Sequence, residues 1–367
     1  MKKVLVLANH ILGIYSFRRE LVQRLLDEGY EVLIAAPSHE KMSYFKQVGC
    51  KCIETPIRRR GANPITDFKL ILNYYEIIKE NKPHLVLTYT IKPNVYGGFV
   101  SRFLRIPYIA NVTGVGTSIE NKGFIRKISL ELYRIGLKRA KCVFFQNEHN
   151  RSFFYNNDIV IGKTKLIPGS GVNLLHHTLE EYPSNDRVIK FLFIGRMMKD
   201  KGINELLIAA SKVKEIYPNV QFDLIGRIED DFNNLLKEYE NNEIIKYHGR
   251  QNNVHSFIKD CHAVINPSYH EGMSNVLLES ASTGRPVLAS KIPGCRETFE
   301  EGVSGFGFEV RNADDLVETI IKFIRLPYVK KKMMGIAGRK KIEKEFDRNI
   351  VIDAYMHEIN KVTGWGK

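Results

Sequence analysis

Short apolar runs alternate with helical patterns along nearly the whole chain, and this alternation restricts the fold more than any other feature. In the first half, buried strands are expected at "KVLVLA", "EVLIAA", "KCIETP", "HLVLTYT", "PYIANVT" and "CVFFQN". In the second half, they are expected at "IKFLFIG", "VQFDLIG", "IIKYHG", "HAVINPS", "RPVLAS" and "GFGFEV". Apolar strands that alternate with helices are typical of parallel sheets covered on both faces. The expected fold class is therefore α/β.

An irregular stretch from Pro168 to Val188 interrupts the alternation with turn residues and weak periodicity. We therefore expect a doubly wound, Rossmann-like domain over residues 1–170, a linker over 171–187 and a second such domain over 188–349. A final helix over roughly 350–367 is expected to pack back onto the first domain. The two domains are expected to face each other across a cleft, with ligands beyond the carboxyl ends of the strands.

The net charge of the chain indicates an anionic partner but does not identify it. The chain has 55 basic and 41 acidic residues, a net charge of +14, which attracts nucleic acid, anionic lipid or phosphorylated substrates. No apolar run is long enough to span a bilayer, and the one in "MKKVLVLANH" ends after five residues, which is too short for a signal peptide. The five irregularly spaced cysteines indicate small buried side chains, not disulfides or zinc. We expect a cytoplasmic protein that associates peripherally with a membrane.

The stretch "FIGRMMKDKG" places two cations between a strand and a helix. Arg196 and Lys201 precede a helix that is expected to begin near Gly202 or Ile203. A guanidinium, an ammonium and the positive end of a helix dipole together suit a diphosphate. A solvated surface turn is the alternative, and this motif alone does not decide between them.

The stretch "PSYHEGMSNVLLES" lies at the end of another strand. Gly272 allows the backbone to turn, and Ser274 is expected to cap the helix that follows. The backbone amides around this cap would form an anion-binding nest at Met273, Ser274 and Asn275.

Two carboxylates, Glu271 and Glu279, lie eight residues apart on either side of that nest. Glu279 is in the second turn of the helix, too far along to cap it, and would accept hydrogen bonds from a vicinal diol such as a ribose. Glu271 precedes the helix and would bind another hydroxylated group. A solvated glutamate on an amphipathic helix is the alternative. Together with the Arg196 and Lys201 motif, we favour the ligand-binding interpretation.

These two motifs resemble the paired signatures of family 4 glycosyltransferases, which have the GT-B fold. "GRMMKDKG" is similar to the first signature, and "EGMSNVLLE" is similar to the second, the E-x7-E motif. Further stretches resemble the bacterial branch that makes capsules, O-antigens and lipid-linked oligosaccharides: "RRRGANPITDFK", "TIKPNVYGG", "TGVGTSIE", "GSGVN", "PGCRE" and "EGVSGFGF".

The resemblance implies retaining transfer of a sugar, most often an N-acetylhexosamine, from a UDP-linked donor to a polyprenyl-diphosphate-linked saccharide. It implies that Arg196 and Lys201 hold the donor diphosphate and that Glu271 orients the donor sugar, which makes these three the expected catalytic residues. Glu279 would bind the ribose, and the loop around Gly249 would hold the base. The donor-binding residues implied are Arg196, Lys201, Gly249, Arg250, Glu271, Gly272, Met273, Ser274, Asn275 and Glu279.

The N-terminal domain is expected to bind the acceptor. The loop "NHILGIYS" follows the first strand, where His10 would face the cleft and Gly13 would allow close approach of a phosphate or sugar. Relatives often have a histidine in the loop that corresponds to "NVTGVGTS". This chain has Asn111 and Thr113 there, which puts a catalytic histidine in doubt.

No D-x-D motif occurs in the chain, so neither a metal nor a cofactor is expected. Arg196, Lys201 and helix dipoles would stabilise the departing diphosphate in place of a metal ion. In the family, the departing phosphate is thought to take the proton of the attacking hydroxyl, so no separate general base is required.

Other functions remain as alternatives. The enzyme can use GDP-mannose or another nucleotide sugar with a different acceptor, or the chain can be a sugar-binding module without activity. Nucleic-acid binding fits the charge, but no zinc-finger or RNA-binding motif supports it. We expect an anionic membrane surface, not nucleic acid, to be the partner of the basic N-terminal domain. Its basic stretches are "IRRRGAN" and residues 121–141, the latter with an apolar stripe that can instead pack on its own sheet.

Overall fold

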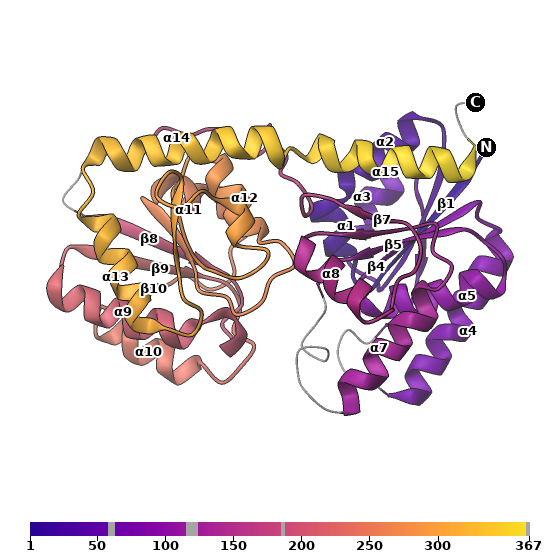
Figure 1. Cartoon of the computed structure of the whole chain (residues 1–367), viewed down its shortest axis with the longest axis horizontal. Coiled ribbons are helices and arrows are strands. Elements are labelled where there is room, and N and C mark those ends of the chain that lie inside the picture. Colours follow the sequence, from indigo (N-terminus) through magenta and orange to yellow (C-terminus); the bar gives the residue numbers. More distant parts are fainter. Residues whose placement is uncertain (58–62, 115–123, 185–187, 365–367) are drawn as a thin grey trace. The chain divides into compact units, whose positions relative to one another are not determined.

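The computed structural model describes residues 1–57, 63–114, 124–184 and 188–364. The arginines of "IRRRGAN", most of "TGVGTSIE", the start of the basic stretch 121–141 and residues 185–187 lie outside these ranges. The chain forms two compact units (Figure 1). Unit 1 comprises Met1–Ser170 and Asn349–Lys367, and unit 2 comprises Gly171–Arg348.

Unit 1 contains a seven-stranded sheet with the order β3-β2-β1-β4-β5-β6-β7, and all of its strand pairs are parallel. The strands are β1 (Lys3–Ala8), β2 (Glu31–Ala36), β3 (Lys51–Glu54), β4 (Leu85–Tyr89), β5 (Tyr108–Val112), β6 (Cys142–Phe145) and β7 (Thr164–Leu166). The strand order reverses between β1 and β4. In doubly wound sheets, ligands bind beyond the carboxyl ends of the strands at such a switch point.

Helices cover both faces of this sheet. One face packs against α1 (Ile11–Phe17), α2 (Arg19–Asp27), α3 (Met42–Gln47) and α15 (Arg348–Thr363). The other packs against α4 (Pro64–Asn81), the π-helix η1 (Pro93–Gly97), α5 (Gly98–Phe103), α7 (Phe124–Leu137) and α8 (Glu148–Asn156). The two faces bury alternate residues of the same strand, such as Val4 and Leu5, as the two-residue period of a strand requires.

The C-terminal helix α15 belongs to unit 1 from Asn349 onward. Its buried side chains, including Tyr355 and Ile359, join the core beneath β1 and β2. Polar contacts add to this packing, because the Tyr30 hydroxyl donates to the Asn360 side chain at 2.6 Å. A chain that leaves unit 1 at Ser170 therefore returns to it at the end.

Unit 2 contains a six-stranded parallel sheet with the order β10-β9-β8-β11-β12-β13. The strands are β8 (Ile189–Ile194), β9 (Val220–Ile225), β10 (Lys246–Tyr247), β11 (Ala263–Asn266), β12 (Val287–Ser290) and β13 (Gly305–Phe308). Its switch point lies between β8 and β11. The two motifs singled out in the sequence follow these two strands, so the fold brings them to one edge of the sheet.

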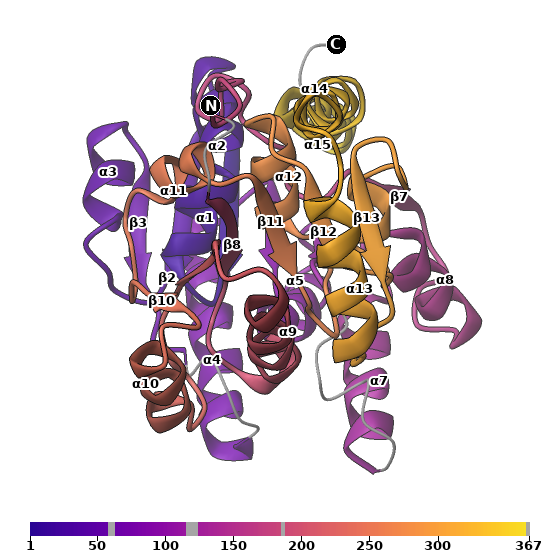
Figure 2. The same ribbon diagram turned by 90° about the vertical axis from the view of Figure 1, so that its left-hand side faces the viewer.

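The helices of unit 2 lie on both faces of its sheet (Figure 2). One face packs against α9 (Ile203–Ile216), α10 (Asn233–Asn241) and α13 (Ala313–Ile324). The other packs against α11 (Val254–Asp260) and α12 (Asn275–Ser282), and α14 (Tyr328–Glu345) covers α12 in turn. Two parallel-sheet α/β units confirm the fold class expected from the sequence.

The described residues of the expected linker are attached to unit 2 along their length. Residues 171–184 belong to unit 2, where Val172 forms a bridge with Asp347. Further along, Tyr182 is buried and donates its hydroxyl to the carbonyl of His262 at 2.8 Å. Residues 171–184 contain no helix or strand, and side-chain contacts and single backbone bonds hold them on unit 2.

Candidate active site

The loops after β8 and β11 lie against each other at the switch point of unit 2. Gly202 has a φ of +69°, and a Cβ there would come within 2.1 Å of the carbonyl oxygen of Pro267. Only glycine tolerates both this left-handed conformation and the close approach. The amide of Tyr269 also donates to the carbonyl of Asp200 at 2.9 Å. Gly202 ends the short helix η2 (Lys199–Lys201) and begins α9, as the sequence predicted.

This packing brings together two of the predicted catalytic residues. Nζ of Lys201 lies 2.5 Å from Oε1 of Glu271, and the two side chains keep 22% and 16% of their surface exposed. An ammonium and a carboxylate that are partly shielded from water interact more strongly than a surface pair does. The pair can therefore hold both groups in fixed positions at the carboxyl end of the sheet.

Arg196 has a different carboxylate partner, which sequence reasoning missed. Its guanidinium lies 2.5 Å from Oε2 of Glu229, and Arg227 lies 2.6 Å from the other oxygen of the same carboxylate. Glu229 follows β9, the strand beside β8, so it reaches the same edge of the sheet. The signal was available in "GRIEDD", a second strand end with charged residues, but no spacing rule linked it to Arg196.

The helix α12 begins as the sequence predicted. Ser274 caps it and accepts a hydrogen bond from the amide of Leu277 at 3.4 Å. The side chain of Asn266, at the end of β11, donates to the Ser274 hydroxyl at 2.6 Å. This bond ties the cap directly to the strand that carries the loop.

The predicted nest of three free amides needs a correction. The amide of Ser274 donates to the carbonyl of Gly294 at 2.8 Å, so it is used within the protein. Gly294 has a φ of +84°, and a Cβ there would come within 2.8 Å of the carbonyl of Gly272. The loop "PGC" therefore packs on the turn before α12. The amides of Met273 and Asn275 are the remaining candidates for an anion.

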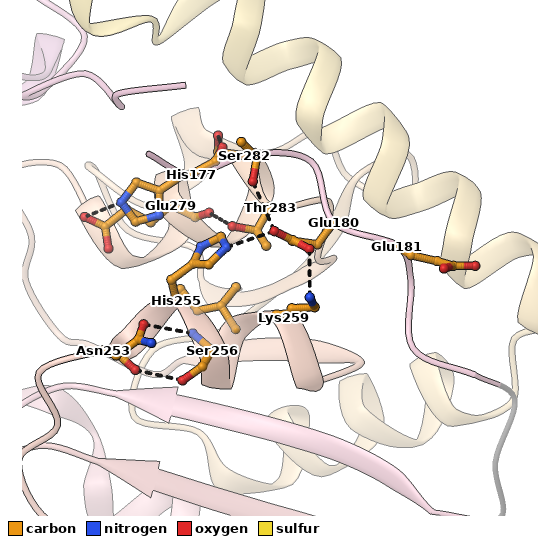
Figure 3. Close-up of polar contacts among 12 residues, drawn as sticks. His177, Glu180, Glu181, Asn253, His255, Ser256, Lys259, Glu279, Ser282 and Thr283 are labelled. Atoms are coloured by element: carbon orange, nitrogen blue, oxygen red, sulfur yellow. Dashed lines mark hydrogen bonds and ion pairs between the residues drawn. The ribbon is translucent and has the colours of Figure 1, made fainter. Parts of the chain in front are cut away.

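Glu279 lies in the second turn of α12, with 22% of its side chain exposed. Burial raises the pKa of its carboxyl to about 7, and the positive charge of Arg348 acts in the opposite direction. Its carboxylate oxygen Oε1 lies 3.9 Å from Nε2 of His177 (Figure 3). A carboxylate in such a half-enclosed place gains from hydroxyl donors that replace lost water.

Gly249 and Arg250 follow β10 on the same side of the sheet. The carbonyl of Gly249 accepts a hydrogen bond from the amide of Gly226 at 2.9 Å, which joins the ends of β9 and β10. Gly249 has a φ of +63° with open space where a side chain would be. Arg250 is exposed. These features leave the loop backbone accessible, as base recognition by backbone contacts requires.

His10 and Gly13 lie together after β1 in unit 1. His10 caps α1, and its Nδ1 accepts a hydrogen bond from the amide of Gly13 at 2.9 Å. A Cβ on Gly13 would come within 2.7 Å of the imidazole. Gly13 therefore makes room for His10, and His10 has a structural role through Nδ1.

Asn111 is enclosed within unit 1, with 1% of its surface exposed. Its side-chain amide donates to the hydroxyl of Tyr355 on α15, and its backbone carbonyl accepts a hydrogen bond from the Asn94 side chain at 2.8 Å. This placement differs from the cleft-facing position expected from the sequence. Thr113 follows β5 and is partly exposed, and the loop continues outside the described residues.

A strained residue at the switch point of unit 1 was also missed. Thr90 follows β4 with a φ of 75°, an unusual conformation for a β-branched residue. Its hydroxyl donates to the side chain of Asn9, which follows the neighbouring strand β1. Such strain is common at binding sites, but no sequence pattern predicts a positive φ at threonine.

Comparisons with known proteins agree with this architecture. Residues 178–341 match the family model for glycosyl transferases group 1, and residues 3–147 match that for glycosyl transferase 4-like proteins. The structure of Anabaena Alr3699/HepE in complex with UDP and glucose superimposes with a TM-score of 0.79 at 17% identity, covering 98% of this chain and 100% of that one. Two doubly wound units of this kind form the GT-B fold.

The chain belongs to the glycosyltransferases of these two family models. It is 25% identical over 366 residues to the N,N'-diacetylbacillosaminyl-diphospho-undecaprenol alpha-1,3-N-acetylgalactosaminyltransferase of Campylobacter jejuni, covering 95% of this chain and 96% of that protein. It is 21% identical over 330 residues to the UDP-Gal:alpha-D-GlcNAc-diphosphoundecaprenol alpha-1,3-galactosyltransferase of Escherichia coli, covering 84% of each. The expected enzyme class is thereby confirmed.

Proposed function

We propose that this glycosyltransferase moves an N-acetylhexosamine from a UDP-linked donor to a polyprenyl-diphosphate-linked saccharide in bacterial surface glycan synthesis. The observation that carries the proposal is the Lys201–Glu271 pair at the switch point of unit 2, 2.5 Å apart. The names of the Campylobacter and Escherichia relatives support the acceptor class. The Anabaena protein of similar fold binds UDP and glucose, which supports UDP as the nucleotide.

In this proposal, the donor diphosphate binds beside Lys201 and Arg196. Each cation has a carboxylate partner: Glu229 pairs with Arg196, and Glu271 pairs with Lys201. The carboxylate holds the cationic side chain in place until the donor diphosphate binds beside it. The amides of Met273 and Asn275 add donors at the start of α12, and Glu279 accepts hydrogen bonds from the ribose. Fixed positive groups stabilise the negative charge that develops on the leaving diphosphate without a metal ion.

The transfer retains the configuration at the anomeric carbon. The acceptor hydroxyl attacks this carbon on the face from which UDP leaves, so a C–O bond to the acceptor forms as the C–O bond to phosphate breaks. The departing phosphate oxygen takes the proton of the hydroxyl. Glu271 orients the donor sugar while Lys201 neutralises the leaving group.

The enzyme would act at an anionic membrane surface on the cytoplasmic side. Ile65, Phe68 and Leu72 on α4 keep 69%, 60% and 46% of their surface exposed, and their spacing puts them on one face of the helix. Phe103 on α5 is 68% exposed and adjoins this face through Tyr75, at a ring distance of 6.2 Å. We call Ile65, Phe68, Leu72 and Phe103 the α4 patch.

Charge around the α4 patch fits anionic lipid. Lys69 is exposed on α4 next to Phe68, and Arg102 and Arg105 lie on either side of Phe103 in the chain. The helix α7, expected to provide this surface, buries Tyr133 and Leu137 in unit 1, although Ile128 and Ile135 stay partly exposed. None of the helices in the described ranges combines the length and apolar character needed to cross a membrane. All five cysteines are free, which fits a reducing compartment.

A donor screen tests the proposed reaction. UDP-GalNAc, UDP-GlcNAc, UDP-Gal and GDP-mannose are offered with a polyprenyl-diphosphate-linked saccharide, and product configuration is read by NMR. We expect turnover with a UDP-N-acetylhexosamine, retained configuration and thermal stabilisation by UDP but not by duplex DNA. Turnover with GDP-mannose alone would favour the alternative donor, and the absence of any response to nucleotide diphosphates would overturn the proposal.

A further inference from the structure

Part of the expected linker lies against the proposed ribose site. We call residues 173–182 the strap. The backbone of His177 is bonded at both ends, because its amide donates to the carbonyl of Asn173 at 2.9 Å and its carbonyl accepts from the Ser282 hydroxyl at 2.7 Å. Arg339 on α14 donates to the same carbonyl at 2.8 Å. His177 therefore has little freedom to move.

The strap is also held on the C-terminal side of His177. Arg285 has no exposed surface and donates to the carbonyls of Glu180 at 3.2 Å and Glu181 at 2.6 Å. A buried guanidinium that binds backbone carbonyls orders the segment that carries them, because losing these bonds would leave buried polar groups unpaired. The position of His177 is thus determined by α12, α14 and the loop before β12.

The imidazole of His177 lies between Glu279 and a second histidine (Figure 3). Its Nε2 is 3.9 Å from Oε1 of Glu279, and its ring contacts that of His255 with centroids 5.7 Å apart. His255 is in turn 3.1 Å from Glu180, whose other oxygen lies 3.3 Å from Lys259. His176 also contacts the His177 ring, with centroids 5.1 Å apart.

Burial, together with the charges around it, keeps His177 neutral at physiological pH. Burial lowers the pKa of its imidazole to about 3, and His176, His255 and Arg348 act in the same direction. With its proton on Nε2, the neutral imidazole would direct an N–H group toward the Glu279 carboxylate, at a separation of 3.9 Å that is longer than a hydrogen bond. This dipole would favour one orientation of the carboxylate without adding a charge that competes with the ribose hydroxyls.

We propose that His177 is a positioning residue of the donor site, and that it holds the Glu279 carboxylate in the orientation that accepts the ribose hydroxyls. This inference rests on the role of Glu279 in the proposed function. It gives the strap a part in nucleotide recognition that none of the motifs in the sequence indicated.

The test compares UDP with 2′-deoxy-UDP by calorimetry on the full chain. We expect His177→Phe, which keeps the ring but not the N–H group, to weaken UDP about tenfold and leave 2′-deoxy-UDP nearly unchanged. His177→Gln offers an N–H group again and should recover most of the affinity. His176→Phe is the matched control and should behave as wild type. In turnover, His177→Phe should raise KM for the donor more than it lowers kcat.

Two results would overturn the role of His177 but leave the proposed function intact. One is an equal loss for both nucleotides in His177→Phe, which indicates a packing defect, and the other is no loss for either. If His177→Phe does not fold, Ser282→Ala, which removes one bond to the His177 carbonyl, should weaken UDP selectively by a smaller factor. Wild-type protein that does not bind UDP, or does not distinguish the two nucleotides, would overturn the role of Glu279 and the inference together.

Discussion

Nζ of Lys201 lies 2.5 Å from Oε1 of Glu271, although the two residues belong to loops after different strands. We expect Lys201→Ala to reduce transfer on the order of a hundredfold, because one preorganised donor to a developing charge contributes about that much. The loss of activity should appear as a lower kcat and also as a higher KM for the donor. Initial rates with the best UDP-sugar measure both.

The matched control for this change is Lys199→Ala. Lys199 is exposed in the same short helix, and its amide, not its side chain, binds Asp230 at 2.9 Å. It should keep nearly full activity. An equal loss in both variants would mean that general charge around η2, not the Lys201–Glu271 pair, supports transfer.

Local signals explain why this part of the site was predictable from sequence. The cap at Ser274 and the start of α9 after Gly202 depend on residues within one helical turn, and both were found where expected. Strand ends on either side of a switch point meet at one edge of the sheet, so Lys201 and Glu271 were correctly expected near each other.

Contacts set by tertiary packing were not predictable. Glu229 reaches Arg196 only because β8 and β9 are neighbours in a particular register. His177 reaches Glu279 because a segment without helix or strand follows the surface of unit 2. The amide of Ser274 was expected to be free, but Gly294, twenty residues further along the chain, binds it. Such contacts have no periodicity or spacing that the sequence displays.

Glu279→Gln should separate stability from function through its pH dependence. Burial raises the pKa of this carboxyl from 4.5 to about 7, so the folded state binds more protons than the unfolded state between these values. Wild-type stability therefore falls as pH rises through this window. Glutamine does not ionise, so the variant should be more stable than wild type at pH 8, by up to about 3 kcal/mol, and similar at pH 4.5.

The same substitution should weaken UDP at pH 8, because a carboxylate accepts two hydroxyl donors better than an amide does. In wild type, UDP affinity should fall as pH drops below about 7, where Glu279 becomes protonated. Thermal unfolding and calorimetry over this range measure both effects. A stability difference that does not change with pH would contradict the assignment of the shifted pKa.

Arg285→Met should be strongly destabilising. The side chain has no exposed surface and donates to backbone carbonyls that include Lys259 at 2.6 Å and Ile258 at 3.1 Å. Leaving several buried carbonyls unpaired costs about 3 kcal/mol or more. Urea unfolding measures the loss. Arg325→Met, which changes an exposed arginine of unit 2, is the control and should alter stability little. Equal effects of the two substitutions would argue against a stabilising role for the bonds from Arg285 to backbone carbonyls.

Phe68→Ser combined with Leu72→Ser should weaken binding to anionic vesicles. The two side chains keep 60% and 46% of their surface exposed and lie beside Lys69, so they can enter the interface while the lysine meets lipid headgroups. Co-sedimentation at low salt measures binding, which added salt should reduce by screening the basic residues.

Ile161→Ser is the control, because Ile161 is 84% exposed in the same unit but outside the α4 patch. The double variant should retain UDP binding and turnover of a short-chain, soluble acceptor. Unchanged sedimentation of the double variant would exclude the α4 patch as the membrane contact.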